Sequence, residues 1–243
     1  MKELTKYLII GLSVIISVIV LASAITFYGR SNETIAVTGL GEKTFVSDKI
    51  VWDGKIAVES TDKLEGFRTL ENQQKQVEKY LHDNGITDEE VTFEFVNTDK
   101  LYSSLYNNDG NYVGARFTGY KISQRFVVTS NDVDKVENIS RKISSLISKN
   151  INIESFSPEY YYTKLDDLKL ELIEKASKDA RLRAENIVAN AGANLGKASS
   201  ARLGVFQITS ANGDEEYSYG GTFNTTSKEK KARITVRMEY KLK

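Results

Sequence analysis

The sequence predicts an α+β fold, in which a largely antiparallel sheet carries helices packed on one face. Segments 49–60 and 230–242 alternate apolar and polar residues, which is typical of a strand with one buried face. Segments 62–84, 132–147 and 165–191 repeat apolar residues at steps of three and four, which is typical of an amphipathic helix. The connections are short, and this favours antiparallel neighbours. The expected order is β-β-α-β-β-α-β-α-β-β, preceded by one N-terminal transmembrane helix.

The first half of this order contains four strands and one helix. The first two strands are expected at 34–40 and 49–60. Asp62 is followed three residues later by Glu65, which is typical of a helix N-terminus, and Asn84-Gly85 is typical of a helix end. Two more strands, at 91–96 and 117–129, are separated by a polar, glycine-bearing loop at 103–114.

The second half begins with a helix that Asn131-Asp132 caps. Pro158, the only proline, indicates an edge position or a bend in the next strand, 151–163. Strands at 197–210 and 230–242 then flank a loop at 212–227 that is rich in Gly, Ser and Thr. The inner β-α-β-β-α-β portion of the whole order matches a split βαβ unit.

The third helix, about 165–191, carries one row of small or aliphatic residues at steps of four. This row is Leu168, Leu172, Ala176, Ala180, Ala184 and Val188. Because alanine has a short side chain, we expect the helix backbone to lie close to its neighbour.

Residues 7–28 carry no charge, and a helix of these 22 residues would be roughly 33 Å long. That length suffices to cross a hydrocarbon core of about 30 Å. Lys2 and Lys6 precede the segment, so we expect a cytoplasmic N-terminus and an exported body. The alternative is a signal peptide cleaved at about Ala24. The chain thus divides into an anchor or signal segment, 1–30, and an exported α+β domain, 31–243.

Composition and motifs argue against several classes of function. The chain has 33 basic and 33 acidic residues, so no excess of positive charge favours nucleic acid. Without cysteine and with one histidine, His82, it offers neither thiolate chemistry nor an imidazole cluster within one subunit. Gly39-Leu40-Gly41 begins like a dinucleotide-binding motif, but extended chain follows it rather than a helix. We expect no catalytic residues, no cofactor and no metal.

Tyrosine is abundant, with 13 residues, and several tyrosines fall in expected loops. Tyr102, Tyr106 and Tyr112 lie in one loop, and Tyr217 and Tyr219 lie in another. A loop tyrosine combines apolar area with a polar tip, which suits contact with a protein or a glycan. The alternative is simple packing at strand ends. These five tyrosines are the candidate contact or ligand-facing residues.

Two sequence patterns resemble the SIMPL-domain family of bacterial envelope proteins. The first is the strand Val37-Thr38-Gly39-Leu40-Gly41-Glu42, followed by Asp48. The second is the third-helix pattern of Ala176, Ala180-Arg181, Ala184-Glu185, Ala189, Gly192 and Leu195-Gly196. The resemblance covers about 34–242 and implies a location in the envelope, with no catalytic motif to carry over. It also implies a tendency to self-associate, since some relatives look like large homo-oligomeric rings.

The expected function is that of a non-enzymatic, membrane-anchored envelope protein that forms homo-oligomers in a structural or stress-related role. Residues 7–28 would hold it in the bacterial cytoplasmic membrane with the body facing the periplasm or the exterior; cleavage would release it to the periplasm. The alternative function is a binding module for a small molecule or an envelope glycan, through a tyrosine-lined crevice near 102–112 and 217–223. A hydrolase built from an Asp–Glu pair is a third hypothesis.

Overall fold

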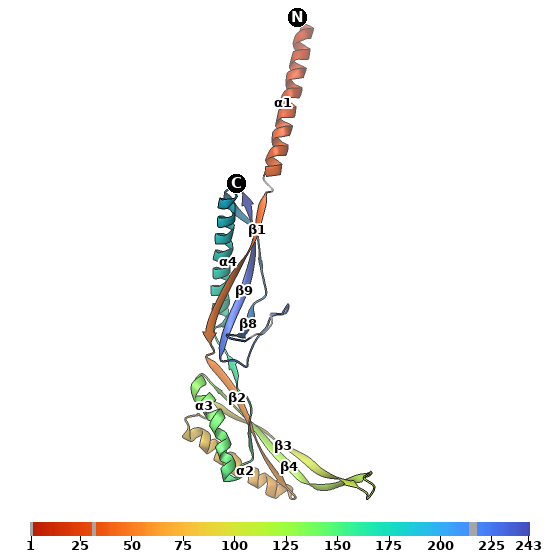
Figure 1. Cartoon of the computed structure of the whole chain (residues 1–243), viewed down its shortest axis with the longest axis vertical. Helices are drawn as coiled ribbons and strands as arrows, with labels where there is room; N and C mark the ends of the chain where they lie inside the picture. The colour runs from red at the N-terminus through yellow and green to blue at the C-terminus, as the bar shows by residue number, and fades with distance from the viewer. Residues whose placement is uncertain (1, 31–32, 214–217) are drawn as a thin grey trace.

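The molecule is elongated, with an N-terminal helix followed by two sheets placed end to end (Figure 1). The computed structural model describes residues 2–30, 33–213 and 218–243, and within the N-terminal helix the side chains of residues 6, 7 and 11–25. The order of elements agrees with the α+β class and with antiparallel pairing throughout the named strands. The expected single sheet is instead two, because the first two strands pair with different partners.

The N-terminal helix α1 (Lys2–Arg30) contains the uncharged segment 7–28 and projects from the body (Figure 1). Its described apolar side chains face solvent; Leu12, Ile16 and Val20, for example, are 60%, 53% and 62% exposed. In the part of the chain that the structure describes, no helix meets the length and hydropathy needed to cross a membrane. The transmembrane helix expected at 7–28 is therefore not supported by the structure.

The first sheet lies next to α1 and has the order β1-β9-β7. These strands are β1 (Thr34–Val46), β9 (Glu229–Leu242) and β7 (Leu195–Leu203), and β8 (Gln207–Ser210) pairs with β9 as well. One helix, α4 (Leu165–Asn190), covers one face of this sheet. The strand expected at 197–210 is thus two strands, separated by a break at residues 204–206.

The second sheet has the order β3-β4-β2-β5, which is that of a split βαβ unit, as the sequence predicts. Its strands are β2 (Lys49–Ser60), β3 (Val91–Tyr106), β4 (Tyr112–Ser130), β5 (Ile153–Ser155) and β6 (Glu159–Tyr161). The strand expected at 151–163 is broken around Pro158 into β5 and β6, which both pair along the edge of β2. The bend at the proline is therefore confirmed.

Two helices cover one face of the second sheet. The first, α2 (Lys63–Asp83), begins where the Asp62 side chain accepts a hydrogen bond from the Glu65 amide, 2.8 Å away. The second, α3 (Val133–Lys142), is shorter than expected because the chain tightens into the 3₁₀ helix η1 (Ile143–Lys149). These helices and the sheet enclose the larger core, in which Trp52 and Phe126 meet edge to face at 5.4 Å.

The α4 helix lies unusually close to β1. All six residues of its predicted row, Leu168, Leu172, Ala176, Ala180, Ala184 and Val188, are buried. They face the glycines of β1: a Cβ built on Gly39 would lie 2.0 Å from the Ala176 carbonyl oxygen. The Leu40 amide, at the free edge of β1, donates to the Asp179 carboxylate of α4 at 2.8 Å. The helix therefore also covers this edge of the sheet.

Hydrogen bonds tie the two sheets together where the chain passes from one to the other. Between β1 and β2, the Asp48 carboxylate accepts hydrogen bonds from the amide and the hydroxyl of Thr163, both at 2.7 Å. The Ser47 amide donates to the Lys228 carbonyl at 2.9 Å. The Lys228 ammonium in turn contacts the carboxylates of Asp134 and Glu137 on α3. These contacts fix one sheet against the other.

The glycine at position 39 gives a direct test of the α4–β1 contact. We expect Gly39→Ala to lower the free energy of unfolding by about 1–3 kcal/mol, because the new methyl group overlaps the α4 backbone, which cannot move aside. Urea denaturation of residues 31–243 measures the change. Gly220→Ala is the matched control, since a Cβ there has nothing within 4 Å, and equal stability of the two variants would contradict the close contact.

Candidate functional site

The second sheet extends into a two-stranded arm, which we define as residues 101–119. The part of β4 that precedes Tyr120 pairs only with β3, since the pairing of β4 with β2 covers Tyr120 to Ser130. Figure 1 shows this arm leaving the body at the end remote from α1. Within the described residues, both edges of the arm therefore carry backbone groups without a neighbouring strand. The expected loop at 103–114 is wrong: this segment is strand, turn and strand.

The turn at the tip of the arm is closed by asparagine. The Asn107 side-chain oxygen accepts hydrogen bonds from the amides of Asp109 and Asn111, at 3.0 and 2.9 Å. Gly110 follows the left-handed path, with φ of 78°. These local bonds form the turn without any contact to the body, as Asn and Gly commonly do in tight turns.

Aromatic side chains run along the arm from its base to its tip. Phe117 contacts Tyr120 and Tyr102 edge to face, with ring centroids 5.1 and 5.9 Å apart. Nearer the tip, Tyr106 and Tyr112 are cross-strand partners 6.0 Å apart. Tyr120 is packed against the core, whereas Tyr102 and Phe117 are 58% and 44% exposed. We call the exposed rings of Tyr102, Tyr106, Tyr112 and Phe117 the aromatic stripe. It begins next to the core at Tyr120 and continues along the arm into solvent.

The arm carries few of the features that normally prevent strand edges from pairing; its strand pairing has register shifts between Leu101 and Tyr102 and between Leu105 and Tyr106. Its paired segments, 101–106 and 112–119, contain one charged residue, Arg116, and no proline. Exposed strand edges are usually protected by charge, proline or a covering element. A strand edge with little charge beside an exposed aromatic stripe is typical of a surface that contacts another protein.

The tyrosines predicted from the sequence are only partly brought together. Tyr102, Tyr106 and Tyr112 share the arm, while Tyr219 lies beside the first sheet, and Figure 1 shows these two regions apart. Tyr217 lies outside the described residues. The crevice expected between 102–112 and 217–223 is therefore absent from the described part of the chain. Phe117, which the sequence analysis passed over, completes the stripe.

A pocket of about 360 Å³ does lie beside Tyr219, next to β8 and β9 of the first sheet. The side chains of Gln207, Arg233 and Thr235 line it together with Val205, Ser218 and Ile234. Tyr219, which also lines the pocket, is fully exposed. No residue of the arm contributes to this pocket.

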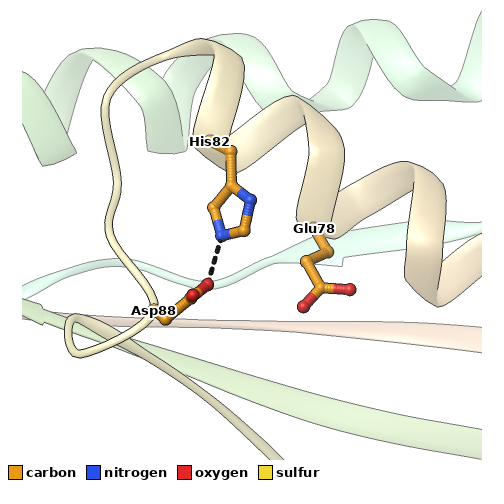
Figure 2. Close-up of side chains that lie close together, drawn as sticks. All are labelled: Glu78, His82 and Asp88. Carbon is orange, nitrogen blue, oxygen red and sulfur yellow. Dashed lines mark ion pairs between the residues drawn. The ribbon is translucent and has the colours of Figure 1, made fainter.

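Folding also brings together one histidine and two carboxylates. Glu78 and His82 are one turn apart on α2, and Asp88 follows in the next loop (Figure 2). The His82 Nε2 lies 2.8 Å from an Asp88 carboxylate oxygen, and one ligand atom from each of the three residues lies within 4.8 Å of the others. His82 is exposed in the last turn of α2, and its two neighbours were not predicted from the sequence. The four-residue spacing of Glu78 and His82 was the only signal in the sequence.

The fold and the arm define an α+β protein of two antiparallel sheets with an exposed aromatic hairpin. A family model described as "SIMPL: Protein of unknown function (DUF541)" matches residues 35–240, and the chain belongs to this family. The match runs from β1 to β9 and so includes both sheets and the arm. Among curated proteins, no match is found.

The arm is expected to be dispensable for folding, because its residues 103–116 contain no buried side chain. Replacing 103–116 by Asn-Gly, which favours a tight hairpin turn, should change the free energy of unfolding by less than about 0.5 kcal/mol. Urea denaturation measures this. Phe126→Ala, in the core, is the contrasting variant and should cost about 3–5 kcal/mol. A loss of that size on shortening the arm would show that the arm is structural.

Proposed function

We propose that this protein is a non-enzymatic, membrane-anchored component of the bacterial cell envelope that associates with copies of itself through the arm. The observation that carries the proposal is the exposed aromatic stripe on a ribbon whose two edges lack neighbouring strands. A two-stranded ribbon is marginally stable by itself in water. A third strand from another copy would satisfy its edge amides and carbonyls and would cover its aromatic rings.

A second copy is a suitable partner for this surface because the arm does not repel itself. Antiparallel pairing of two 112–119 segments would place no like charges opposite each other, provided that the two Arg116 side chains are offset. Copies held in one membrane also meet at a high local concentration, so that weak contacts become effective.

The proposed anchor is α1. The uncharged segment 7–28 supports it, as does the exposure of the described apolar side chains of the helix. Lys2 and Lys6 would keep the N-terminus in the cytoplasm, and the body would face the periplasm or the exterior. Cleavage near Ala24 would instead give a periplasmic protein with the same arm.

The alternative function, binding of a small molecule or an envelope glycan, is supported by the pocket beside Tyr219. Its volume, about 360 Å³, falls within the usual range for small-molecule sites. The arm tyrosines take no part in this pocket, so such binding would leave the aromatic stripe without a role. Self-association therefore accounts for more of the exposed aromatic surface.

Self-association is tested by light scattering after size-exclusion chromatography of residues 31–243. We expect a particle mass at least twice that of one 31–243 chain, and a fall to the mass of one chain in Tyr102→Ser/Phe117→Ser, because this change removes the centre of the stripe. Phe156→Ser is the matched control: Phe156 is 43% exposed, as Phe117 is 44%, but follows β5 on the opposite edge of the sheet. A monomeric unsubstituted protein at high concentration would exclude the proposal.

Anchoring is tested by fractionation of cells that express the full chain. The unsubstituted protein should stay with the membranes through an alkaline carbonate wash, and Ile16→Arg/Val20→Arg should release it. Each arginine at a membrane centre costs about 2.5–3.5 kcal/mol. The control is Ile187→Arg on α4, where the side chain is similarly exposed, at 52%. Release of the unsubstituted protein with an intact N-terminus would contradict anchoring.

A further inference from the structure

The group formed by Glu78, His82 and Asp88 lies on the surface of α2, separate from the arm. Figure 2 shows the His82 imidazole directed at Asp88, with the Glu78 carboxylate on the same side of the helix. The four-residue spacing places Glu78 and His82 on one face of α2. All three side chains reach solvent, so that an ion could enter without any opening of the core.

The position of Asp88 is fixed by the turn that ends α2. Gly85, with φ of 86°, reverses the chain, and its amide donates to the His82 carbonyl at 2.9 Å. Ile86 is then buried in the core, at 2% exposure. Beyond Asp88, the Glu90 carboxylate accepts a hydrogen bond from the Thr87 amide at 3.0 Å. The backbone is therefore held on both sides of Asp88.

The negative charge of the group is not neutralised by nearby lysines. Lys79, one residue after Glu78, pairs with Asp83 at 3.0 Å. Lys135, which approaches from α3, donates to the Gly85 carbonyl at 2.9 Å and lies 3.5 Å from Glu90. Within the described residues, the Glu78 carboxylate has no ion pair. Two carboxylates and a neutral imidazole thus present a charge of about −2, which matches a divalent cation.

We propose that Glu78, His82 and Asp88 bind one divalent transition-metal ion, with water in the remaining coordination positions. One imidazole nitrogen and two carboxylate oxygens are ligands that Zn²⁺ accepts. In a tetrahedral zinc site the ligand atoms lie about 3.4 Å apart. To reach that geometry, Glu78 would have to approach the other two ligands from a separation of up to 4.8 Å, and the 2.8 Å between His82 and Asp88 would have to lengthen slightly. Zinc takes the Nε2 lone pair of the neutral imidazole, whose hydrogen is then on Nδ1, and any proton bound at Nε2 is released to solvent.

The test is a calorimetric titration of ZnCl₂ into the full chain in detergent, without a polyhistidine tag. We expect one Zn²⁺ per chain. His82→Ala should abolish the binding heat. Glu78→Gln and Asp88→Asn should each weaken zinc binding by at least about tenfold, because losing even a residue that only hydrogen-bonds a metal ligand weakens metal binding by about that factor. Asp83→Asn is the matched control, because Asp83 adjoins His82 but pairs with Lys79, and it should bind zinc unchanged.

His82 is the only histidine in the chain, so its imidazole NMR signals report on this site alone. Zinc should shift these signals at the same concentration in the unsubstituted protein and in Asp83→Asn, and Asp88→Asn should need at least about ten times more zinc for the same shift. Should His82→Ala misfold, His82→Gln replaces it in the titration. The proposal would be overturned if His82→Ala or His82→Gln bound zinc as tightly as the unsubstituted protein. It would also be overturned if the unsubstituted protein bound no zinc at about 1 mM Zn²⁺.

Discussion

The close contact between α4 and β1 determines how the first sheet is built. Glycines at 39 and 41 and alanines on α4 let two backbones approach to a distance that any larger side chain would prevent. At this distance the Asp179 carboxylate reaches the Leu40 amide, and Lys43 reaches Glu171 at 2.6 Å. The helix thereby performs two tasks: it buries one face of the sheet and it satisfies part of the free edge of β1. The alternating pattern of β9 then faces α4 on one side and solvent on the other.

The protected edge of β1 makes the bare edges of the arm informative. The same chain covers one exposed strand with a helix and leaves the two strands of the arm without a covering element or proline, and with one charged residue, Arg116. Folding gains little from the arm, because its outer residues bury nothing, and a ribbon of two strands is barely stable alone. The arm exposes aromatic side chains and contributes no buried side chains to the core. Contact with another molecule explains such a feature best. This contrast within one molecule is the main argument for a partner.

Elements with one buried face were predictable from the sequence, whereas the arm and the His82 group were not. The α4 row from Leu168 to Val188 and the alternation of β9 were correctly predicted, because burial of one face requires apolar residues at regular intervals along the sequence. The arm has no buried face, so residues 103–114 lack that period and resemble a loop. The alternation of β1 and β2 also says nothing about which strand pairs with which, and one sheet was expected where two exist. Asp88 reaches His82 only through the turn at Gly85, which spacing alone does not reveal.

The placement of the arm restricts how anchored copies could meet. Because α1 and the arm lie at opposite ends of the molecule, contacts between arms would form away from the proposed membrane surface (Figure 1). Copies inserted in one membrane share an orientation, so their arms lie at one height above it. Symmetric assembly then requires an axis along the membrane normal, since an axis in the membrane plane would direct one α1 away from the lipid. The contacts of Asp48 and Lys228 hold the two sheets in a fixed orientation, and this gives the arm a fixed angle to the first sheet, which adjoins α1.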